Sequence, residues 1–398
     1  MIKGKTIVLG VTGGIAVYKV ADLASRLTQL GAKVEVVMTE SAMELISPLT
    51  FQTLTGRRVH TDLFDTPPDW HVTHVALGEM ADVVVIAPAT ANTIAKICHG
   101  VADNLLTCTV LATRSPVIIA PAMNNNMWEN PVTQENVARL KARGFVFAGP
   151  GYGRLATGKI GVGRLVENGV IIGTVAQVLG RSGDLAGKTV VVTAGGTQEP
   201  IDPVRIITNR SSGKQGYALA EAARDRGAKV VLVTAPVAIP EPVGVEVVKV
   251  ETAREMKKAL DKVMKNAHAL IMTAAVADYE AKSPAKNKIK KEASGSLVLE
   301  LTRTPDIITE VKGDFIRIGF AAESQDLIEN ARKKLIGKKL DLIVANDITR
   351  TDSGFGADTN KVYIISPGGK LEDLPLMSKR EVADRVLDRV VKLLKGKS

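Results

Sequence analysis

Short apolar runs rich in Val and Ile recur along the chain and alternate with stretches of helical periodicity. Such runs lie at residues 33–38, 83–86 and 117–119. Before the first of these runs, apolar residues recur at helical spacing from Val20 to Leu30, and Gly31 follows directly. Continuous apolar runs are typical of strands buried on both faces, whereas the intervening period indicates amphipathic helices ended by glycine. The pattern predicts an α/β fold with parallel sheets.

The beginning of the chain is repeated near its middle. The strand and glycine-rich turn at residues 5–14 return at 188–197, and the Gly-Ala-Lys-Val sequence at 31–34 returns at 227–230. In both places a strand enters a turn, a helix follows, and a second strand begins. We therefore predict two doubly wound, Rossmann-like α/β domains.

The boundary between the two domains is expected in the polar stretch 181–187, which places the domains at residues 1–184 and 185–398. The second copy of the unit contains an extra polar segment, residues 198–216, before its helix. A loop that leads into a helix N-terminus presents free backbone N–H groups to an anion. This segment is a predicted phosphate-binding loop.

Composition narrows the class of protein. The 398 residues are 45% hydrophobic and 24% charged, and no apolar run approaches the ~20 residues of a membrane span. The apolar start is predicted to be a first strand and not a signal peptide, because Gly13, Gly14 and Lys19 interrupt it. Cys98 and Cys108 lack metal or CxxC spacing, which indicates a reduced, cytoplasmic protein.

The net charge of +10 is compatible with nucleic-acid binding or with steering of small anionic substrates. Aromatic residues make up only 4% of the chain, too few for base-stacking surfaces. We expect small-molecule substrates and no nucleic acid.

Two polar segments follow buried strands, at residues 88–93 and 121–128. They carry the amides of Asn92 and Asn124, which can donate and accept hydrogen bonds to a heterocycle without adding charge. Loops at the carboxyl ends of parallel strands are where open α/β sheets bind ligands. These two segments closely resemble the signature loops of the homo-oligomeric flavin-containing cysteine decarboxylases.

The resemblance implies an FMN site. The turn Gly13-Gly14 opens the first helix and either holds a phosphate or is simply a tight turn. Thr39 and Ser41 either bind that phosphate or cap a helix. FMN is favoured over FAD because no acidic residue is positioned for an adenosine ribose. The predicted FMN-binding residues are Gly13, Gly14, Ile15, Thr39, Ser41, Thr90, Asn92 and Met123.

The resemblance also assigns catalytic residues. His74 precedes Asp82 by the family spacing, although His71 lies nearby and a surface position is an alternative for a histidine at a helix start. Asn124 matches the asparagine that grips the substrate carboxylate of 4′-phosphopantothenoylcysteine. Thr157 occupies the position of the catalytic cysteine in the segment 155–164.

Because of this replacement, three interpretations of the first domain stay open. In the first, another acid replaces the cysteine and completes the reaction, and Lys159 is the nearest candidate in sequence. In the second, the domain carries out only an oxidative decarboxylation and releases an enethiol. In the third, the domain is a non-catalytic assembly module.

The second half carries an ordered set of motifs that resembles the phosphopantothenate–cysteine ligase domain. With the first half, essentially the whole chain resembles the bifunctional phosphopantothenoylcysteine decarboxylase/phosphopantothenate–cysteine ligase family of coenzyme A synthesis. The motifs lie at residues 202–214, 274–278, 288–291, 304–307, 319–323 and 340–347.

The ligase resemblance implies that CTP activates phosphopantothenate as an acyl cytidylate, which the cysteine amine then attacks; ATP is the open alternative. Asn209 and Arg205 would bind substrate, Lys288 would stabilise charge at the α-phosphate, and Asp278 would bind Mg²⁺. The predicted nucleotide-binding residues are Ser211, Gly213, Gly216, Ala274, Ala275, Asp278, Lys288, Pro305, Asp306, Ile307, Ile308, Phe320, Lys334 and Lys338. The implied assembly is a homo-oligomer: a trimer-based dodecamer through the flavin domain and a dimer through the ligase domain.

Overall fold

The computed structural model describes residues 1–64, 72–290, 297–323, 325–347, 353 and 356–396, and the statements below concern these residues. The chain divides into two compact units, Met1–Gly180 and Arg181–Ser398. The predicted boundary, between residues 184 and 185, lies a few residues further along. Each unit is described by itself.

Unit 1 contains a six-stranded sheet in the order β3-β2-β1-β4-β5-β6. All neighbouring strands are parallel, and the register pairs Ile7 of β1 with Val34 on one side and with Val83 on the other. The strands are β1 Thr6–Val11, β2 Lys33–Met38, β3 Val59–His60, β4 Val83–Ala89, β5 Val117–Pro121 and β6 Val146–Phe147.

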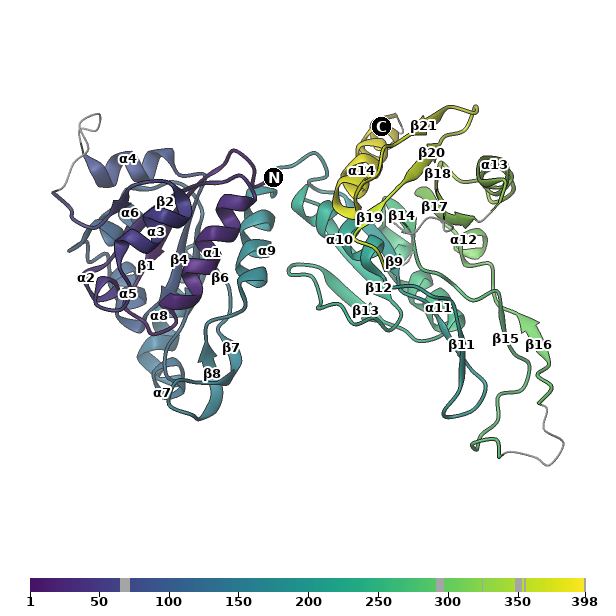
Figure 1. The fold of residues 1–398 in the computed structure, drawn as a ribbon, viewed down its shortest axis with the longest axis horizontal. Coiled ribbons are helices and arrows are strands. Elements are labelled where there is room, and N and C mark those ends of the chain that lie inside the picture. The colour runs from purple at the N-terminus through teal and green to yellow at the C-terminus, as the bar shows by residue number, and fades with distance from the viewer. Residues whose placement is uncertain (65–71, 291–296, 324, 348–352, 354–355, 397–398) are drawn as a thin grey trace. The chain divides into compact units, whose positions relative to one another are not determined.

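Helices cover both faces of this sheet (Figure 1). They are α1 Val17–Gln29, α2 Glu40–Met43, α3 Pro48–Thr55, α4 Thr73–Met80, α5 Ala91–His99, α6 Leu105–Ala112, α7 Asn125–Glu129, α8 Pro131–Ala142 and α9 Asn168–Leu179. An antiparallel hairpin, β7 Gly151–Arg154 and β8 Ile160–Arg164, precedes α9.

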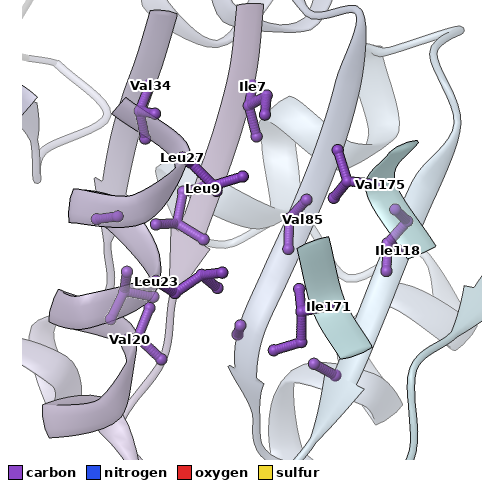
Figure 2. Close-up of a cluster of buried hydrophobic side chains, with 14 of the residues drawn as sticks. Ile7, Leu9, Val20, Leu23, Leu27, Val34, Val85, Ile118, Ile171 and Val175 are labelled. Atoms are coloured by element: carbon purple, nitrogen blue, oxygen red, sulfur yellow. The ribbon is translucent and has the colours of Figure 1, made fainter. Parts of the chain in front are cut away.

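The core of unit 1 follows the alternation of side chains along the strands. Leu9 points to one face, where Leu23 of α1 and Ile171 of α9 pack against it (Figure 2). Val8 points to the other face and packs with a second cluster that includes Ile94 of α5. These residues are essentially inaccessible to solvent, so the sheet is buried on both sides as the apolar runs predict.

Unit 2 repeats the strand order and extends it. Its eight-stranded sheet runs β13-β12-β9-β14-β17-β18-β20-β21; the first six strands are parallel and the last two are antiparallel. The strands are β9 Thr189–Ala194, β12 Lys229–Thr234, β13 Glu246–Lys249, β14 Ala269–Met272, β17 Ile316–Glu323, β18 Leu342–Asp347, β20 Val362–Ile365 and β21 Leu371–Asp373.

Helices of unit 2 also pack on both faces, with Val192 facing α10 and α14 and Val191 facing α11. The remaining elements are short hairpins and connecting helices. The helices are α10 Lys214–Asp225, α11 Ala253–Val263, η1 Met264–Asn266, α12 Ile307–Glu310, α13 Leu327–Gly337 and α14 Lys379–Gly396. The short strands are β10 Gln198–Pro200, β11 Ile206–Thr208, β15 Tyr279–Ala281, β16 Leu301–Arg303, β19 Thr359–Asn360 and β22 Met377–Ser378.

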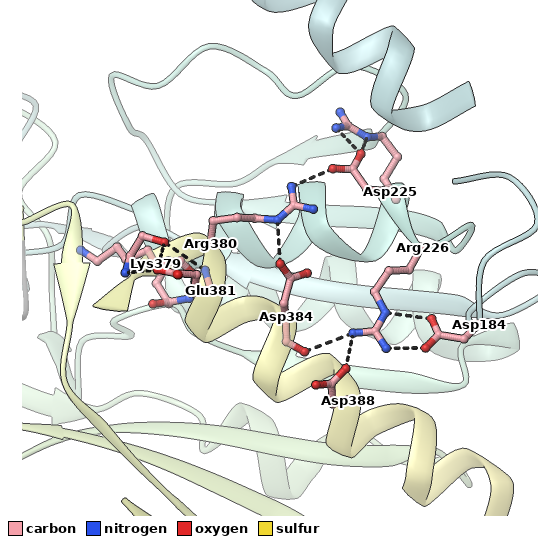
Figure 3. A network of polar contacts seen from close by, with 11 residues as sticks. Asp184, Asp225, Arg226, Lys379, Arg380, Glu381, Asp384 and Asp388 are labelled. Carbon is pink, nitrogen blue, oxygen red and sulfur yellow. Dashed lines mark hydrogen bonds and ion pairs between the residues drawn. The ribbon is translucent and has the colours of Figure 1, made fainter. Parts of the chain in front are cut away.

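A charged network joins the start of unit 2 to its last helix (Figure 3). The Arg226 guanidinium donates to Asp184 (2.8 Å) and to Asp388 of α14 (2.9 Å). Arg380 of α14 donates to Asp225 (2.7 Å). Leu185, next to Asp184, is fully buried in the core. The residues around 184 and 185 are therefore integral to unit 2.

The observed architecture confirms the predicted fold class of two doubly wound α/β domains. The predicted runs 33–38, 83–86 and 117–119 fall within strands β2, β4 and β5. Neither cysteine forms a disulfide. Within the described residues, no helix combines the length and apolarity that crossing a membrane requires.

Candidate active sites

The strand order of the unit 1 sheet reverses between β1 and β4, and open α/β sheets bind ligands at the carboxyl edge beside such a switch point. Thr12 bridges the loops at this switch point. Its hydroxyl donates to the Pro88 carbonyl (2.5 Å) and accepts from the Thr90 backbone N–H (3.2 Å), and the residue is buried. These bonds hold the turns after β1 and β4 beside each other.

The turn after β1 approaches the α2 region closely. A Cβ at Gly13 would lie 2.8 Å from the Ser41 carbonyl oxygen, so only glycine fits there. Helix α1 begins without a side-chain cap and without an acidic residue in its first turn. Its positive end is therefore available to a phosphate. Ile15 in this turn is largely exposed.

Thr39 stands at the N-cap position of α2, but its side chain makes no capping bond. Its hydroxyl is buried and has no hydrogen-bond partner among the described residues. An unpaired buried hydroxyl costs free energy that a ligand oxygen would recover. Thr39 therefore fits the phosphate alternative better than the capping alternative, whereas Ser41 is exposed.

The two signature loops place their amides at helix starts. Thr90 caps α5 by accepting from the Thr93 N–H (3.3 Å), and exposed Asn92 lies in the first turn of that helix. Asn124 caps α7 by accepting from the Asn126 N–H (2.9 Å). Half-buried Met123 precedes it. The side-chain oxygen of Asn124 thus already accepts one hydrogen bond from the backbone.

The β7–β8 hairpin is attached to the 121–125 loop. Gly163 accepts from the Met123 N–H (2.9 Å), and Asn125 accepts from the Val162 N–H (2.9 Å). The tip is a turn closed by the bond from Gly158 N–H to the Leu155 carbonyl (2.9 Å). Thr157 lies at this exposed tip. The hairpin therefore combines a fixed base with an open tip.

His74 lies in the first turn of α4, with a buried Nδ1 that has no partner among the described residues. Figure 1 shows α4 and α7 at opposite ends of unit 1, so one chain does not bring His74 to Asn124. His71 falls outside the described residues.

The switch point of unit 2, between β9 and β14, is closed by threonine in the same way. The Thr193 hydroxyl accepts from the N–H groups of Thr273 (3.2 Å) and Ala274 (3.1 Å). The Thr197 hydroxyl accepts from Ala277 N–H (2.9 Å). The loops that follow the two strands are thereby fixed.

A cleft of about 780 Å³ opens above this switch point. It brings together residues from several loops that are far apart in the chain. The predicted residues that line it are Asn209, Ser211, Gly213, Gly216, Ala274, Ala275, Asp278, Pro305, Asp306, Ile307, Ile308, Phe320, Lys334 and Lys338. Lys288 and Arg205 are not in its lining.

One wall of the cleft is the start of α10. Gly213 adopts a left-handed conformation with φ of 74° and gives α10 no side-chain cap. A Cβ at Gly216 would lie 2.9 Å from the Thr193 carbonyl oxygen, so glycine lets α10 pack directly on β9. Uncapped N–H groups beside Ser211 form the kind of site that binds phosphates.

Across the cleft, the Asn209 NH₂ donates to the Val276 carbonyl (2.9 Å). Thr304 binds the two backbone carbonyls that flank the Asp278 side chain. Its hydroxyl donates to the Ala277 carbonyl (2.6 Å), and its N–H donates to the Asp278 carbonyl (3.1 Å). The backbone around Asp278 is therefore fixed while its carboxylate stays exposed.

Each of the two lysines predicted to bind the nucleotide forms an ion pair within the protein. Lys334 contacts Glu323 (2.6 Å) and Lys338 contacts Asp306 (2.9 Å). A nucleotide must compete with these half-exposed pairs, which are worth little in water.

Lys288 lies, exposed, on the segment between β15 and β16. Asp202 holds that segment, since it accepts from Ile289 N–H (3.1 Å) and from Arg205 (2.5 Å). Arg205 also donates to the Ile289 carbonyl (3.2 Å). Burial raises the Asp202 pKa, but hydrogen bonds from Val204, Ile289 and Arg205 outweigh it and lower the pKa to about 2. Arg205 thus has partners outside the cleft lining.

Sequence reasoning missed several residues that line the cleft: Arg210, Lys214, Gln215, Asn346, Asn360 and Lys379. Lys214 was adjacent to the predicted Gly213 and is detectable as the first residue of the helix. Lys379 opens the last helix, far from any recognised motif, and gives no local signal.

The fold defines a protein made of two Rossmann-like domains, each with an uncapped helix start at the switch point of its sheet. Residues 1–180 match the family model described as Flavoprotein, and residues 185–394 match the DNA/pantothenate metabolism flavoprotein C-terminal domain. The chain belongs to the family of coenzyme A biosynthesis bifunctional proteins CoaBC.

The relatives match along nearly their whole length. The coenzyme A biosynthesis bifunctional protein CoaBC of Bacillus subtilis is 46% identical, over 99% of this chain and 98% of its own. The Escherichia coli protein of that name is 42% identical, over 98% of this chain and 97% of its own. A crystal structure of the C-terminal domain of a CoaBC protein is 41% identical, covers 54% of this chain and 100% of its own, and has a TM-score of 0.47.

The Asp202 interactions predict an acid-sensitive contribution to stability. The folded-state pKa of about 2 lies below the ordinary value of 3.8, so the stabilisation is fully present above about pH 4 and is lost as the pH falls towards 2. We expect the difference in unfolding free energy between wild type and Asp202→Asn to be constant from pH 7 to about 4 and to shrink below. Denaturant unfolding measures it; a difference that grows below pH 4 contradicts the assignment.

Proposed function

We propose that the protein catalyses two consecutive steps of coenzyme A biosynthesis. Unit 2 joins 4′-phosphopantothenate to cysteine, and unit 1 decarboxylates the 4′-phosphopantothenoylcysteine that results. The observation that carries this proposal is the unit 2 cleft, in which loops distant in sequence converge on one switch point with an uncapped helix start, the exposed Asp278 carboxylate and four lysines.

The nucleotide of the first step is CTP. Its phosphates are held by the start of α10 and by Ser211, and its base lies near residues 305–308 and Phe320. Asp278 binds the Mg²⁺, because the other lining carboxylate, Asp306, is paired with Lys338. The described residues contain no group of three or more His, Cys, Asp or Glu side chains arranged for a metal. A single carboxylate suits Mg²⁺, which takes its other ligands from triphosphate oxygens and water.

The ligation proceeds by two displacements. A carboxylate oxygen of phosphopantothenate attacks the α-phosphorus, and pyrophosphate leaves. The neutral amine of cysteine then attacks the acyl carbon, so that CMP leaves and the amine proton passes to solvent. Lys288 stabilises the charge that develops in the first displacement, and Asn209 holds the acyl intermediate.

In this proposal, Lys288 acts in a second copy of the chain. Its segment belongs to an arm formed by β10, β11, β15 and β16, which projects from the body of unit 2 in Figure 1. The arm exposes Val204, Val298 and Leu301 to solvent, and exposed apolar side chains on one element mark an interaction surface. Unit 2 therefore forms a dimer in which each arm covers the cleft of its partner.

Unit 1 holds FMN at the β1/β4 switch point. The uncapped start of α1, the close approach at Gly13 and the unpaired Thr39 hydroxyl fit its phosphate, while Thr90, Asn92 and Met123 lie on the loops beside it. Bound FMN supplies two-electron oxidation of the substrate Cβ–S bond and the later return of a hydride. Asn124 donates to the substrate carboxylate before CO₂ is lost.

His74 completes this site from another subunit, because its helix α4 lies at the opposite end of unit 1 from α7, which Asn124 caps (Figure 1). The trimer-based dodecamer places such sites between subunits. His74 orients the substrate or moves its proton through the buried Nδ1. Small-molecule substrates, a cytoplasmic location and no nucleic-acid partner complete the proposal.

For unit 1, we predict that the purified protein retains FMN and that Thr39→Val loses it. The variant keeps the side-chain volume but removes the hydroxyl that binds the phosphate. Denaturation followed by chromatography and visible absorption measures the flavin. Stoichiometric FAD, or full FMN retention in Thr39→Val, contradicts the site; Thr53→Val, at an exposed helix position, is the matched control.

For unit 2, Lys288→Ala is expected to slow acyl-cytidylate formation by roughly 10²–10³-fold, the effect of losing one transition-state charge partner. Asn209→Ala is expected to form the cytidylate and accumulate it. Pyrophosphate release and mass spectrometry separate the two effects. Because the arm acts in trans, mixed dimers of the two variants regain product formation; mixtures no more active than the variants alone refute the trans arrangement.

Thr157 tests the second half of the decarboxylase reaction. A thiol has a pKa of ~8.5 and donates a proton readily, whereas an alkyl hydroxyl is far too weak an acid. We expect Lys159, also at the exposed tip, or a relayed water to supply the proton, so that wild type yields phosphopantetheine. Mass spectrometry decides: a wild-type product two hydrogens lighter, corrected by Thr157→Cys, supports oxidative decarboxylation instead.

A further inference from the structure

One corner of the unit 2 cleft is formed by side chains that have no assigned ligand, although it borders the helix start assigned to the nucleotide. Lys214 at the start of α10, Lys379 at the start of α14 and Asn360 of β19 meet there. Packing of α10 against α14 brings the two helix starts together, since both helices cover the same face of the sheet. The corner thus depends on tertiary structure and not on a local motif.

Two lysines in this corner face one short loop. Lys214 Nζ donates to the Gly356 carbonyl (2.8 Å) and pairs with Asp358 (2.7 Å). Lys379 Nζ donates to the Ala357 carbonyl (2.5 Å), and the residue is only 6% exposed. Among the described residues, Asp358 is a carboxylate that faces both lysines, and its side chain is 89% exposed. The side chains of Lys214, Lys379 and Asp358 together carry one positive charge, with Lys379 at the buried base.

The positive charge of Lys214 disfavours the protonated form of the buried Lys379. Burial, followed by the charge of Lys214, lowers the pKa of Lys379, and Asp358 only partly opposes this. An anion placed between the two ammonium groups would relieve both effects, because it restores a counter-charge that burial removes.

Asn360 supplies an unused hydrogen-bonding group at the same place. The residue is 4% exposed, and its Oδ1 is buried without a partner among the described residues. Its Nδ2 lies 3.4 Å from the Gln215 Oε1, a long hydrogen bond. Rotation of the amide exchanges donor and acceptor, so Asn360 can satisfy either a phosphate oxygen or a phosphate hydroxyl.

The cations assigned so far leave one substrate phosphate group without a binding partner. Lys334 and Lys338, together with the start of α10, serve the nucleotide. Arg205, the cation predicted for the acid substrate, is held by Asp202 outside the cleft lining. A phosphate monoester carries a charge of about −1.5 to −2 near neutral pH and favours several cationic donors.

We propose that Lys214, Lys379 and Asn360 form a binding subsite for a substrate phosphate group in the ligase cleft. The subsite rests on the ligase function proposed for unit 2. Its occupant is the terminal phosphate of the acid substrate or the terminal phosphates of the nucleotide. If the occupant is the phosphate of the acid substrate, the subsite is what distinguishes phosphopantothenate from unphosphorylated pantothenate.

Charge-removing variants test the subsite in the full-length protein. In Lys214→Met and Lys379→Met, we expect kcat/KM for phosphopantothenate to fall by roughly 10–100-fold, as for loss of a charged hydrogen bond, while kcat/KM for pantothenate is unchanged. Lys257→Met, which removes the same charge from α11 outside the cleft, is the matched control. An unchanged preference for phosphopantothenate together with a raised KM for CTP assigns the subsite to the nucleotide.

Unchanged parameters for both substrates in Lys214→Met, or an equal loss in the Lys257→Met control, overturn the subsite. Lys379→Met is judged only if its melting temperature matches wild type, because it alters a buried side chain; Lys214→Met changes a half-exposed one. Titration calorimetry with phosphopantothenate and with CTP gives an independent measure of binding. A wild-type protein that forms no acyl cytidylate refutes the ligase function itself, which is a separate result.

Discussion

The reversal of strand order beside the first strand of each sheet is the constraint on which both candidate sites depend. Parallel strands present their carboxyl ends at one edge, and where the order reverses, successive loops diverge and leave a crevice. In unit 1 the reversal lies between β1 and β4, and in unit 2 between β9 and β14. Buried hydroxyls of Thr12 and Thr193 bridge the loops at these points. Each hydroxyl satisfies backbone groups that burial would otherwise leave unpaired.

Both switch points are suited to anions because helices start at them without side-chain caps. Helices α1 and α10 both lack a side-chain cap, and glycines let the preceding turns approach their neighbours closely. The rest of each site is more polar than charged in unit 1 and strongly cationic in unit 2. That difference suits a flavin held by hydrogen bonds in one unit and the phosphates of several substrates in the other.

Much of this architecture could be predicted from the sequence, because buried parallel strands leave continuous apolar runs and strand–helix turns leave glycines. The run at residues 83–86 becomes β4, and the glycine after the first helix, Gly31, adopts a left-handed conformation with φ of 82°. The loops that line the unit 2 cleft were predicted as motifs and converge as the strand order requires.

What the sequence could not supply is contact between distant segments. The ion pair of Arg205 with Asp202, the arm position of Lys288 and the separation of His74 from Asn124 are set by tertiary packing. Lys379 enters the cleft only because α14 packs beside α10. No periodicity or residue spacing in the amino-acid sequence indicates any of these contacts.

The central claim is that two independent switch-point sites in one polypeptide perform consecutive reactions. The most direct measurement incubates the purified protein with 4′-phosphopantothenate, cysteine, CTP and Mg²⁺ and follows the products by mass spectrometry. Wild type is predicted to yield CMP and phosphopantetheine through phosphopantothenoylcysteine. Asp278→Ala is predicted to lose ligation but still to decarboxylate added phosphopantothenoylcysteine at the wild-type rate. Absence of phosphopantothenoylcysteine and CMP with wild type, or joint loss of both activities in Asp278→Ala, would contradict the account.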